Sequence, residues 1–340
     1  MNSDETINHG ESMSDRDWLV PCAGLTIASG AVALWFMPDR SGMMPALKLL
    51  PMWMMVAAIM AAFCGPTGLF PMMMAGVKSP LRHLVDSALN RWRVGLLIAL
   101  GMGLAGLNMV TFMWTKPLLN HLVPFWSDPL LARIDHILFF GIDPWRLLSW
   151  MNNVPTALFY HRGWFAMMIA TLLLVLSRPP SAQKSALLLA YFLLWSVFGP
   201  VVHILLPAGG PVFFDDLGYG PRFNGIFQPG EMQEMSAYLW STYVAGGFGP
   251  GSGISAMPSL HIATTGWMLL AVRTLAPRWT VAMAALGLLI FLLSISLGWH
   301  YAADGIVGAA GAYGAYRLSL RWLARDRTWL RRREPGPVRA

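Results

Sequence analysis

The chain has 340 residues, of which 56% are hydrophobic and only 12% are charged, and its formal net charge is +7. Soluble globular domains carry about 25% charged residues, so this composition excludes an ordinary soluble protein and favours a membrane protein. The excess positive charge lies mainly among the C-terminal arginines, which favours contact with anionic lipid rather than with nucleic acid.

The apolar segments predict an all-α fold, a polytopic bundle of transmembrane helices. A helix needs roughly 20 mostly apolar residues to cross the bilayer. The N-terminus is acidic, so it lacks the basic region of a cleavable signal, and we expect the first apolar segment to remain as a helix. About eight segments are predicted spans: 18–37, 46–64, 93–115, 157–177, 184–206, 260–276, 279–299 and 301–321.

The lysines and arginines of the connecting segments predict the orientation of this bundle. They occur in segments 65–92, 177–184 and 276–279 and in the C-terminal tail, which all fall on one side if there are eight spans. That side is expected to be the cytoplasm and to hold both termini. The two long connections, 116–156 and 207–259, would then face the periplasm or a lumen.

Three regions follow from this layout. Residues 1–92 are predicted to form an acidic tail with two additional spans, 93–321 a six-helix core, and 322–340 a basic cytoplasmic tail that touches anionic lipid. Cys22 and Cys64 both lie in apolar segments, and they predict neither a disulfide framework nor a thiolate metal site.

A glycine-rich segment that ends at His261 runs directly into an apolar helix. Pro258 suits the first turn of that helix, and Ser252 or Ser255 could cap it. The free N–H groups of a helix start attract phosphate, and Ser259 and His261 lie beside them. A capped helix with an unreactive histidine at the water boundary explains this segment equally well.

His300 and Asp304 are four residues apart, which places them on one face of a helix. An aspartate in an apolar span is costly unless it is paired. Asp304 could fix one ring nitrogen of His300 as N–H and leave the other as a nucleophile. The alternative is a structural pair that tethers two helices. A tight turn at Pro277 would bring His261 and His300 to the same face of the membrane.

These residues resemble the motifs of the type-2 phosphatidic acid phosphatase superfamily of integral membrane proteins. The segment from Pro258 to His261 matches its Pro-Ser-x-His motif, and His300 with Asp304 matches its His-x-x-x-Asp motif. Gly298 also fits. The likeness covers about residues 250–311, and the helix layout extends it over much of the chain after residue 93.

The resemblance implies a phosphoryl-transfer mechanism. His300 would attack phosphorus and form a phosphohistidine, Asp304 would support it, and His261 would protonate the leaving oxygen. No metal and no cofactor are expected. The candidate substrate-binding residues are Ser259, Pro258, Gly298, Tyr301 and Arg222.

Two elements of the family pattern are missing. The first motif, a lysine followed seven residues later by Arg-Pro, is not found, and Ser294 replaces the arginine six residues before the nucleophile. Both elements normally grip phosphate oxygens. The sequence therefore looks closer to the inositol phosphorylceramide synthase branch, and a phospholipid or sphingolipid diester suits a site with few cations better than a monoester does.

Other readings remain open. A lipid or polyprenyl phosphate phosphatase is one alternative, and a non-catalytic transporter or scaffold is another, although transporters usually place ionisable groups near the midplane. Asp128, Asp135 and Asp143 are expected on a solvated interfacial helix with local ion pairs rather than in a headgroup site. His203 is expected to be packed and hydrogen-bonded, and Tyr301 is also compatible with an aromatic belt.

Overall fold

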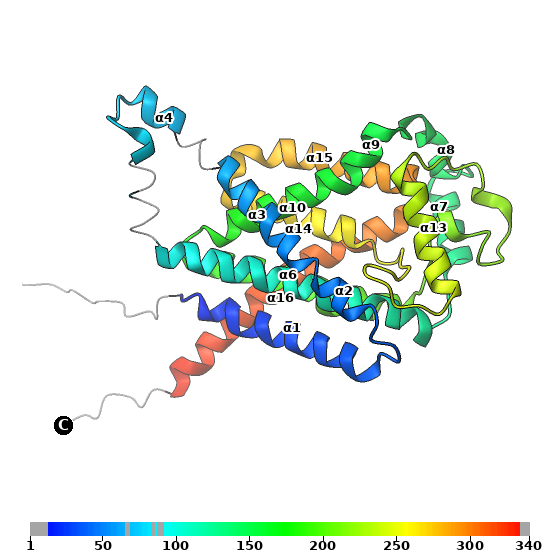
Figure 1. The fold of residues 1–340 in the computed structure, drawn as a ribbon, viewed down its shortest axis with the longest axis horizontal. Coiled ribbons are helices and arrows are strands. Elements are labelled where there is room, and N and C mark those ends of the chain that lie inside the picture. The colour runs from blue at the N-terminus through cyan, green and yellow to red at the C-terminus, as the bar shows by residue number, and fades with distance from the viewer. Residues whose placement is uncertain (1–12, 65–68, 83–85, 87–91, 334–340) are drawn as a thin grey trace, which may run out of the picture.

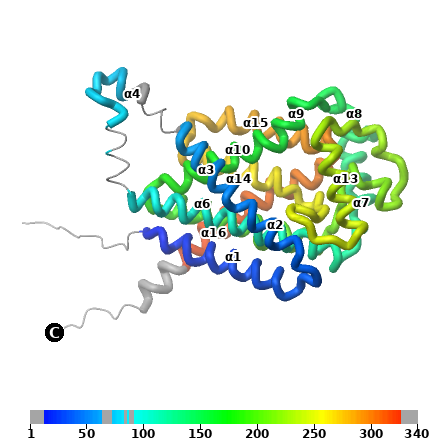
Figure 2. The backbone as a smooth tube through the Cα atoms, viewed as in Figure 1, coloured from blue at the N-terminus to red at the C-terminus, as the bar shows by residue number. Residues whose placement is uncertain are grey.

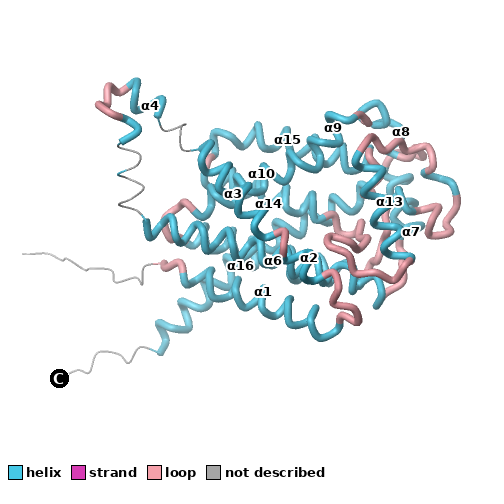
Figure 3. The backbone as a smooth tube through the Cα atoms, viewed as in Figure 1, coloured by secondary structure: helices cyan, strands magenta, loops and turns pink. Residues whose placement is uncertain are grey.

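The computed structural model describes residues 13–64, 69–82, 86 and 92–333, and over these ranges it consists of helices joined by turns and loops (Figure 3). The predicted all-α fold is therefore confirmed. The side chain of Cys64 and those of the arginines beyond Arg325 lie outside the described residues, whereas Cys22 is a buried free thiol.

Six helical segments are long and apolar enough to cross a membrane. Some are continuous and others are composed of two helices in succession. They are α1 (Arg16–Phe36), α2 with α3 (Met43–Leu47, Leu50–Cys64), α6 (Trp92–Leu122), α9 with α10 (Val154–Leu158, Trp164–Leu176), α11 with α12 (Ala182–Leu193, Gly199–Leu205) and α15 (Thr280–Ser296).

Two of the eight predicted spans do not meet these criteria in the described part of the chain. The helix α14 (Leu260–Leu275) has only 16 residues. The helix α16 (Ala302–Arg333) is long, but its composition includes Asp304 and a series of arginines. The two helices pack closely against each other, and both also contact α11. Because neighbouring helices cover α14, it does not have to present a full-length apolar surface to lipid.

Close contact between α14 and α16 depends on Gly308. A Cβ atom at this position would lie 2.5 Å from the carbonyl oxygen of Ser259 and 3.1 Å from the amide nitrogen of Ala263. Any larger residue would therefore push the start of α14 away from α16. This contact holds the first turns of the two helices side by side.

The long connections between α6 and α10 and between α12 and α14 gather at one end of the bundle (Figure 1). The helices α7 (Asp128–Leu138), α8 (Pro144–Leu148) and α13 (Glu231–Val244) lie there, while α4 (Leu69–Met74) lies at the other end. Figure 2 shows α1 running beside α6, and the two helices pack together.

The basic residues Arg178 and Lys184 make their contacts at the end of the bundle opposite α7, α8 and α13. A guanidinium nitrogen of Arg178 donates to the carbonyl oxygen of Leu275 at 3.1 Å. The buried ammonium of Lys184 lies 2.7 Å from Oδ1 of Asp15. The loop between α10 and α11, the end of α14 and the start of α1 therefore meet at this end.

Candidate active site

The structure brings His261 and His300 together. His261 lies in the first turn of α14, and His300 lies just before α16. Their ring centroids are 6.0 Å apart, and the planes are inclined by 57°. Both residues line one cavity of about 440 Å³. The juxtaposition that the sequence predicts is therefore present in the fold.

The start of α14 is capped by Ser259, whose Oγ accepts a hydrogen bond from the amide of Ile262 at 3.3 Å. The prediction that Ser252 or Ser255 caps the helix was wrong. Pro258 precedes the cap instead of lying in the first turn. The amide of Ser259 also donates to the carbonyl oxygen of Asp304 at 3.3 Å, which joins the two motifs through the main chain.

The imidazole of His300 is oriented by a main-chain acceptor. Its Nδ1 lies 2.8 Å from the carbonyl oxygen of Ala256. Since a carbonyl oxygen can only accept, Nδ1 carries the hydrogen and Nε2 keeps its lone pair when the ring is neutral. Oδ2 of Asp304 is 3.6 Å from Nδ1, beyond hydrogen-bonding distance. The direct partner is therefore Ala256, and not Asp304 as expected from the sequence.

Asp304 nevertheless lies behind His300. Its Oδ2 accepts a hydrogen bond from the amide of Tyr301 at 2.9 Å. Its Oδ1 is buried and has no hydrogen-bond partner among the described residues. A carboxylate in this place can stabilise positive charge on the imidazole by electrostatics, without taking its proton.

Aromatic side chains fix the ring of His261. Tyr160 stacks on it with a centroid distance of 5.0 Å and an angle of 20°, and the ring of Trp164 lies 4.2 Å away. The indole N–H of Trp164 also donates to the carbonyl oxygen of His261. Nε2 of His261 is buried and makes no hydrogen bond to any residue that the structure describes. It is therefore available to exchange a proton with a bound molecule.

The cavity around these histidines is mostly apolar and aromatic. Ligand pockets typically measure about 300–1,000 Å³ and combine such a lining with a few polar groups. The apolar part includes Met109, Phe112, Met113, Phe165 and Trp195. The polar part includes Lys116, His161 and Ser255.

The other predicted substrate-binding residues take different positions. Pro258 lines the cavity. Ser259 is fully buried as the cap of α14. The carbonyl oxygen of Gly298 accepts from the amide of Val212 at 2.9 Å, away from the cavity lining.

Tyr301 is buried rather than exposed in an aromatic belt, and its hydroxyl donates to Asp128 at 2.9 Å. Arg222 is engaged by Asp143, with N–O distances of 2.5 and 3.1 Å, and it also donates to the carbonyl oxygen of Ala132. Neither residue is among those that line the cavity. Tyr301 lines the small pocket on the other side of His300, so the structure brings neither Tyr301 nor Arg222 into the cavity that His261 and His300 share.

Asp128 and Asp135 correct the prediction of a solvated interfacial helix, because both carboxyl groups are buried. Asp128 accepts hydrogen bonds from the amides of Gly209 and Gly210, each at 2.8 Å. Asp135 accepts from the amides of Ala302 and Ala303 at 2.6 and 3.0 Å. The two carboxyl groups thus hold the segments on either side of His300.

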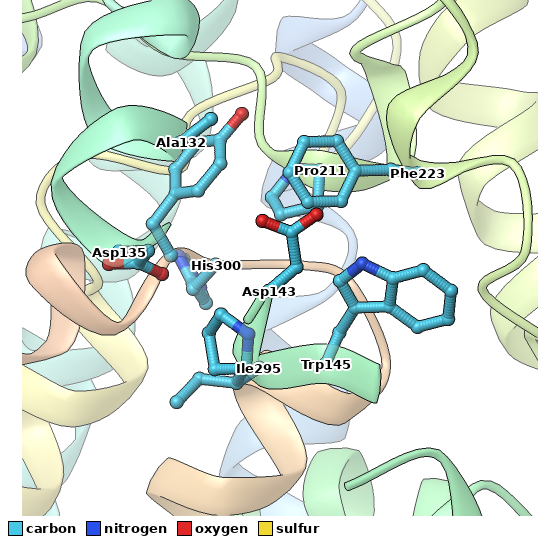
Figure 4. Close-up of a pocket in the computed structure, with 10 residues that line it drawn as sticks. Ala132, Asp135, Asp143, Trp145, Pro211, Phe223, Ile295 and His300 are labelled. Atoms are coloured by element: carbon cyan, nitrogen blue, oxygen red, sulfur yellow. The ribbon is translucent and has the colours of Figure 1, made fainter. Parts of the chain in front are cut away.

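Asp143 is buried as well, and it forms a local ion pair with His136 and a long-range one with Arg222 in the distant connection before α13. Figure 4 looks into a small pocket that Asp135, Asp143 and His300 line together with Trp145 and Phe223. This pocket adjoins His300 on the side of α7 and α8, and its volume of about 10 Å³ leaves no room for a substrate.

Burial raises the pKa of the two carboxyl groups on α7, whereas the pKa of Asp143, just before α8, is lowered. Burial raises the pKa of Asp135 to about 6, although the amides of Ala302 and Ala303 favour the charged form. Burial also raises the pKa of Asp128, against the amides of Gly209 and Gly210. For Asp143, burial opposes ionisation, but the hydrogen bonds and charge of Arg222 outweigh it and lower the pKa.

Two residues that line the cavity, Lys116 and His161, were not predicted from the sequence. A signal for Lys116 was present, because it is the only charged residue of α6 after Arg93, and an ionisable group in an apolar span marks a functional candidate. His203, in contrast, is packed as predicted. Its Nε2 lies 3.3 Å from the side-chain nitrogen of Asn120, and its Nδ1 lies 2.9 Å from the hydroxyl of Ser255.

One of three comparisons with known proteins identifies a family. The sequence profile of the PAP2 superfamily matches residues 130–318. No curated protein and no solved structure matches the chain. The matched segment contains His261, His300 and Asp304, whereas Lys116 lies before its first residue.

Proposed function

The chain belongs to the PAP2 superfamily, and on this premise we propose that it is a membrane lipid phosphotransferase that works through a phosphohistidine on His300. Membership in this family implies phosphatase or phosphotransferase activity on phosphate esters. The observation that carries the proposal is the cavity that both His261 and His300 line. The hydrogen bond from Nδ1 of His300 to Ala256 leaves the lone pair on Nε2, which supports Nε2 as the nucleophile.

The proposed reaction has two steps. In the first, Nε2 of His300 forms a bond to phosphorus while the bond from phosphorus to the leaving oxygen breaks, and a protonated His261 gives its proton to that oxygen. In the second, His261 takes the proton of an acceptor hydroxyl, whose oxygen bonds to phosphorus as the bond to Nε2 breaks. Asp304 stabilises the positive charge of the His300 ring in between.

The donor and acceptor that we favour are lipids. The mostly apolar lining of the cavity supports a hydrocarbon chain as part of the substrate. The Pro258–His261 motif, together with the missing basic motif, supports a transferase of the inositol phosphorylceramide synthase type, which moves a phospho-headgroup from a phospholipid to a second lipid. A water molecule as acceptor would instead make the protein a lipid or polyprenyl phosphate phosphatase.

The orientation is part of the proposal. The basic loops around Arg178 and the end of α14 meet at one end of the bundle, and the positive-inside rule supports a cytoplasmic location for that end. His261 and His300 lie at the starts of α14 and α16, away from Leu275. The reaction would then take place near the periplasmic or lumenal surface.

Substitution of the three proposed catalytic residues tests the function. Purified His300→Ala, His261→Ala and Asp304→Asn proteins are incubated with phospholipids labelled in the phosphate and with lipid alcohols. We expect turnover to fall by about 10²- to 10⁴-fold in each of the two histidine variants. His121→Ala is the control, because its exposed ring lies against Phe248 instead of in the cavity.

The products separate the alternatives. A new phospholipid supports the transferase, and free phosphate supports the phosphatase. Wild-type protein is expected to carry acid-labile phosphate that His300→Ala lacks. Full turnover by both histidine variants would contradict the catalytic assignment. Absence of any product from every lipid pool would favour a non-catalytic transporter or scaffold.

A further inference from the structure

The inner end of the cavity lies between α6 and α10. The connection that contains α7 follows α6 directly, so residues earlier in α6 lie farther from that end of the bundle and deeper inside it. Among the described residues of α6, Met109 is the first that lines the cavity, and on α10, which runs the opposite way, Phe165 is the last. These two side chains therefore mark the depth that the cavity reaches.

The indole of Trp53 fills the space beyond this depth. Trp53 lies in α3, before the family match, and it is buried. A Cβ atom on Gly106 would lie 2.7 Å from Cδ1 and 2.9 Å from Nε1 of Trp53. The indole meets the ring of Phe165 edge-on, at 5.4 Å and 77°, and its N–H donates to the carbonyl oxygen of Met102 at 2.9 Å. The indole is thus fixed between α6 and α10.

The face of α6 that lines the cavity continues to Gly106. Gly106, Met109 and Met113 are spaced by three and seven residues, which places them on one face of the helix. Because Gly106 has no side chain, the room on this face next to Met109 is taken by residues of α3. They are Trp53 and Leu50, whose Cδ1 would lie 2.7 Å from a Cβ atom on Gly106. The closure of the cavity therefore depends on α3.

We propose that Trp53 closes the inner end of the cavity and sets the longest hydrocarbon chain that a substrate can insert beside the two histidines. This inference rests on the proposed function, in which the phosphate lies between His261 and His300 and the chain occupies the apolar part of the cavity. Trp53 does not touch the reacting atoms. It selects substrates by the length of the chain.

The hydrophobic effect gives this selection a measurable form. Each methylene that is buried strengthens binding by about fourfold, whereas a methylene that finds no room in the cavity adds nothing. The affinity of the wild-type protein should therefore rise with chain length and then level off. Removal of the indole frees the space over Gly106, next to Met109 and Phe165, and the rise should continue to longer chains.

A series of n-alkyl phosphates with even chain lengths, from octyl to octadecyl phosphate, tests the inference without requiring turnover. Affinities are measured by calorimetry on the purified full-length protein, in one detergent, for wild type, Trp53→Ala, Met109→Phe and Trp18→Ala. Trp18→Ala is the matched control. Trp18 is also a fully buried tryptophan of an N-terminal span, but its N–H donates to Asp15 and it does not line the cavity. Comparison at each length cancels the affinity of the probe for detergent.

Trp53→Ala should bind the longest probes about tenfold or more tightly than wild type does, because about two further methylenes are buried, and the shortest probes equally well. Met109→Phe fills the inner end, so its affinity should level off at a shorter chain. Trp18→Ala should keep the wild-type length profile. The longest probes should also raise the thermal midpoint of Trp53→Ala more than that of wild type, since a tighter ligand stabilises the folded state more.

The same length profile in Trp53→Ala and wild type would overturn the inference and would indicate that the chain leaves the cavity towards the bilayer. A longer profile in Trp18→Ala as well would attribute the change to general loosening and would also overturn it. If Trp53→Ala does not fold, a wild-type profile in Met109→Phe has the same meaning.

His300→Ala separates this result from the proposed function. It should lose turnover and keep the wild-type dependence of affinity on chain length. If His300→Ala turns over normally, the proposed mechanism fails, and the length profile of Trp53→Ala still decides whether Trp53 closes the cavity.

Discussion

At the scale of single residues, the carboxyl group of Asp135 shows how buried acids support the site without entering the cavity. Both of its oxygens accept from amides at the start of α16, only two residues after His300. It is therefore a positioning residue for the loop that carries the nucleophile. Its burial also links the stability of this loop to pH, since burial raises its pKa to about 6.

The first prediction at this scale concerns that link. The pKa of Asp135 is raised from near 4 to about 6 on folding, so the folded state binds the proton more tightly. The stability that this proton provides is present below about pH 4 and is lost as the pH rises towards 6. A shift of about two units corresponds to at most about 3 kcal/mol.

Thermal unfolding between about pH 4 and pH 7 measures this contribution. The wild-type midpoint should fall up to about pH 6 and then level off, and Asp135→Asn should lack that part of the decrease. Glu234→Gln, at an exposed position of α13, is the control for the loss of one acidic side chain. Identical pH profiles for wild type and Asp135→Asn would contradict the assignment.

Residue identity predicted part of the site. His261, His300 and Asp304 were found because histidine and aspartate are rare in apolar spans, and their spacing limits how they can meet. The burial of Asp128 and Asp135 was not predicted. Their partners are amides of residues far away in the chain, and every residue type except proline has such an amide.

At the scale of elements, the packing of α14 on α16 determines the distance between the two motifs. Hydropathy predicted both helices, and their observed starts lie close to the predicted ones. It could not show that α14 is covered by other helices, because a local average contains no information on neighbours. The cap at Ser259 was missed since several serines precede the helix, and only the chain path decides which one faces Ile262.

A pair of glycines in α16 provides the prediction at this scale. Gly308→Ala would place a methyl group against the backbone of Ser259, so we expect a loss of about 1–3 kcal/mol in the free energy of unfolding and reduced turnover. Gly314→Ala has no atom within 4 Å of the new methyl group, and it should stabilise the helix by up to about 1 kcal/mol.

Thermal unfolding and turnover of the two variants, measured side by side, check this expectation. The matched pair separates crowding from helix propensity, because both substitutions introduce the same side chain in the same helix. If Gly308→Ala is as stable and as active as Gly314→Ala, the close approach of the two helices has no role in the geometry of the site.

At the scale of the whole molecule, the fold places the long connections with α7, α8 and α13 at one end (Figure 1), and Arg178 and Lys184 make their contacts at the other. The order of the apolar segments predicted this separation on the premise of eight spans, of which six meet the length and composition criteria in the described residues. The absolute orientation depends on the positive-inside rule, and it is therefore a proposal that labelling can test.

Single cysteines at the two ends provide that test. In a background with Cys22 and Cys64 replaced by alanine, Asn224→Cys and Gln183→Cys introduce thiols at exposed positions. Asn224 lies in the long connection before α13, and Gln183 lies at the start of α11. A membrane-impermeant maleimide should label the first in intact cells and the second only after permeabilisation. The reverse pattern would place the active site in the cytoplasm.

The hydrogen bond between His300 and the carbonyl oxygen of Ala256 has a consequence for how this protein can vary. A main-chain oxygen exists at position 256 whichever amino acid the gene encodes. The path of the backbone therefore determines which ring nitrogen of His300 carries the hydrogen. A substitution at position 256 changes the space around the ring but leaves a main-chain acceptor. Because Ala256 is fully buried, the acceptor keeps its place only as long as the side chain at this position stays small.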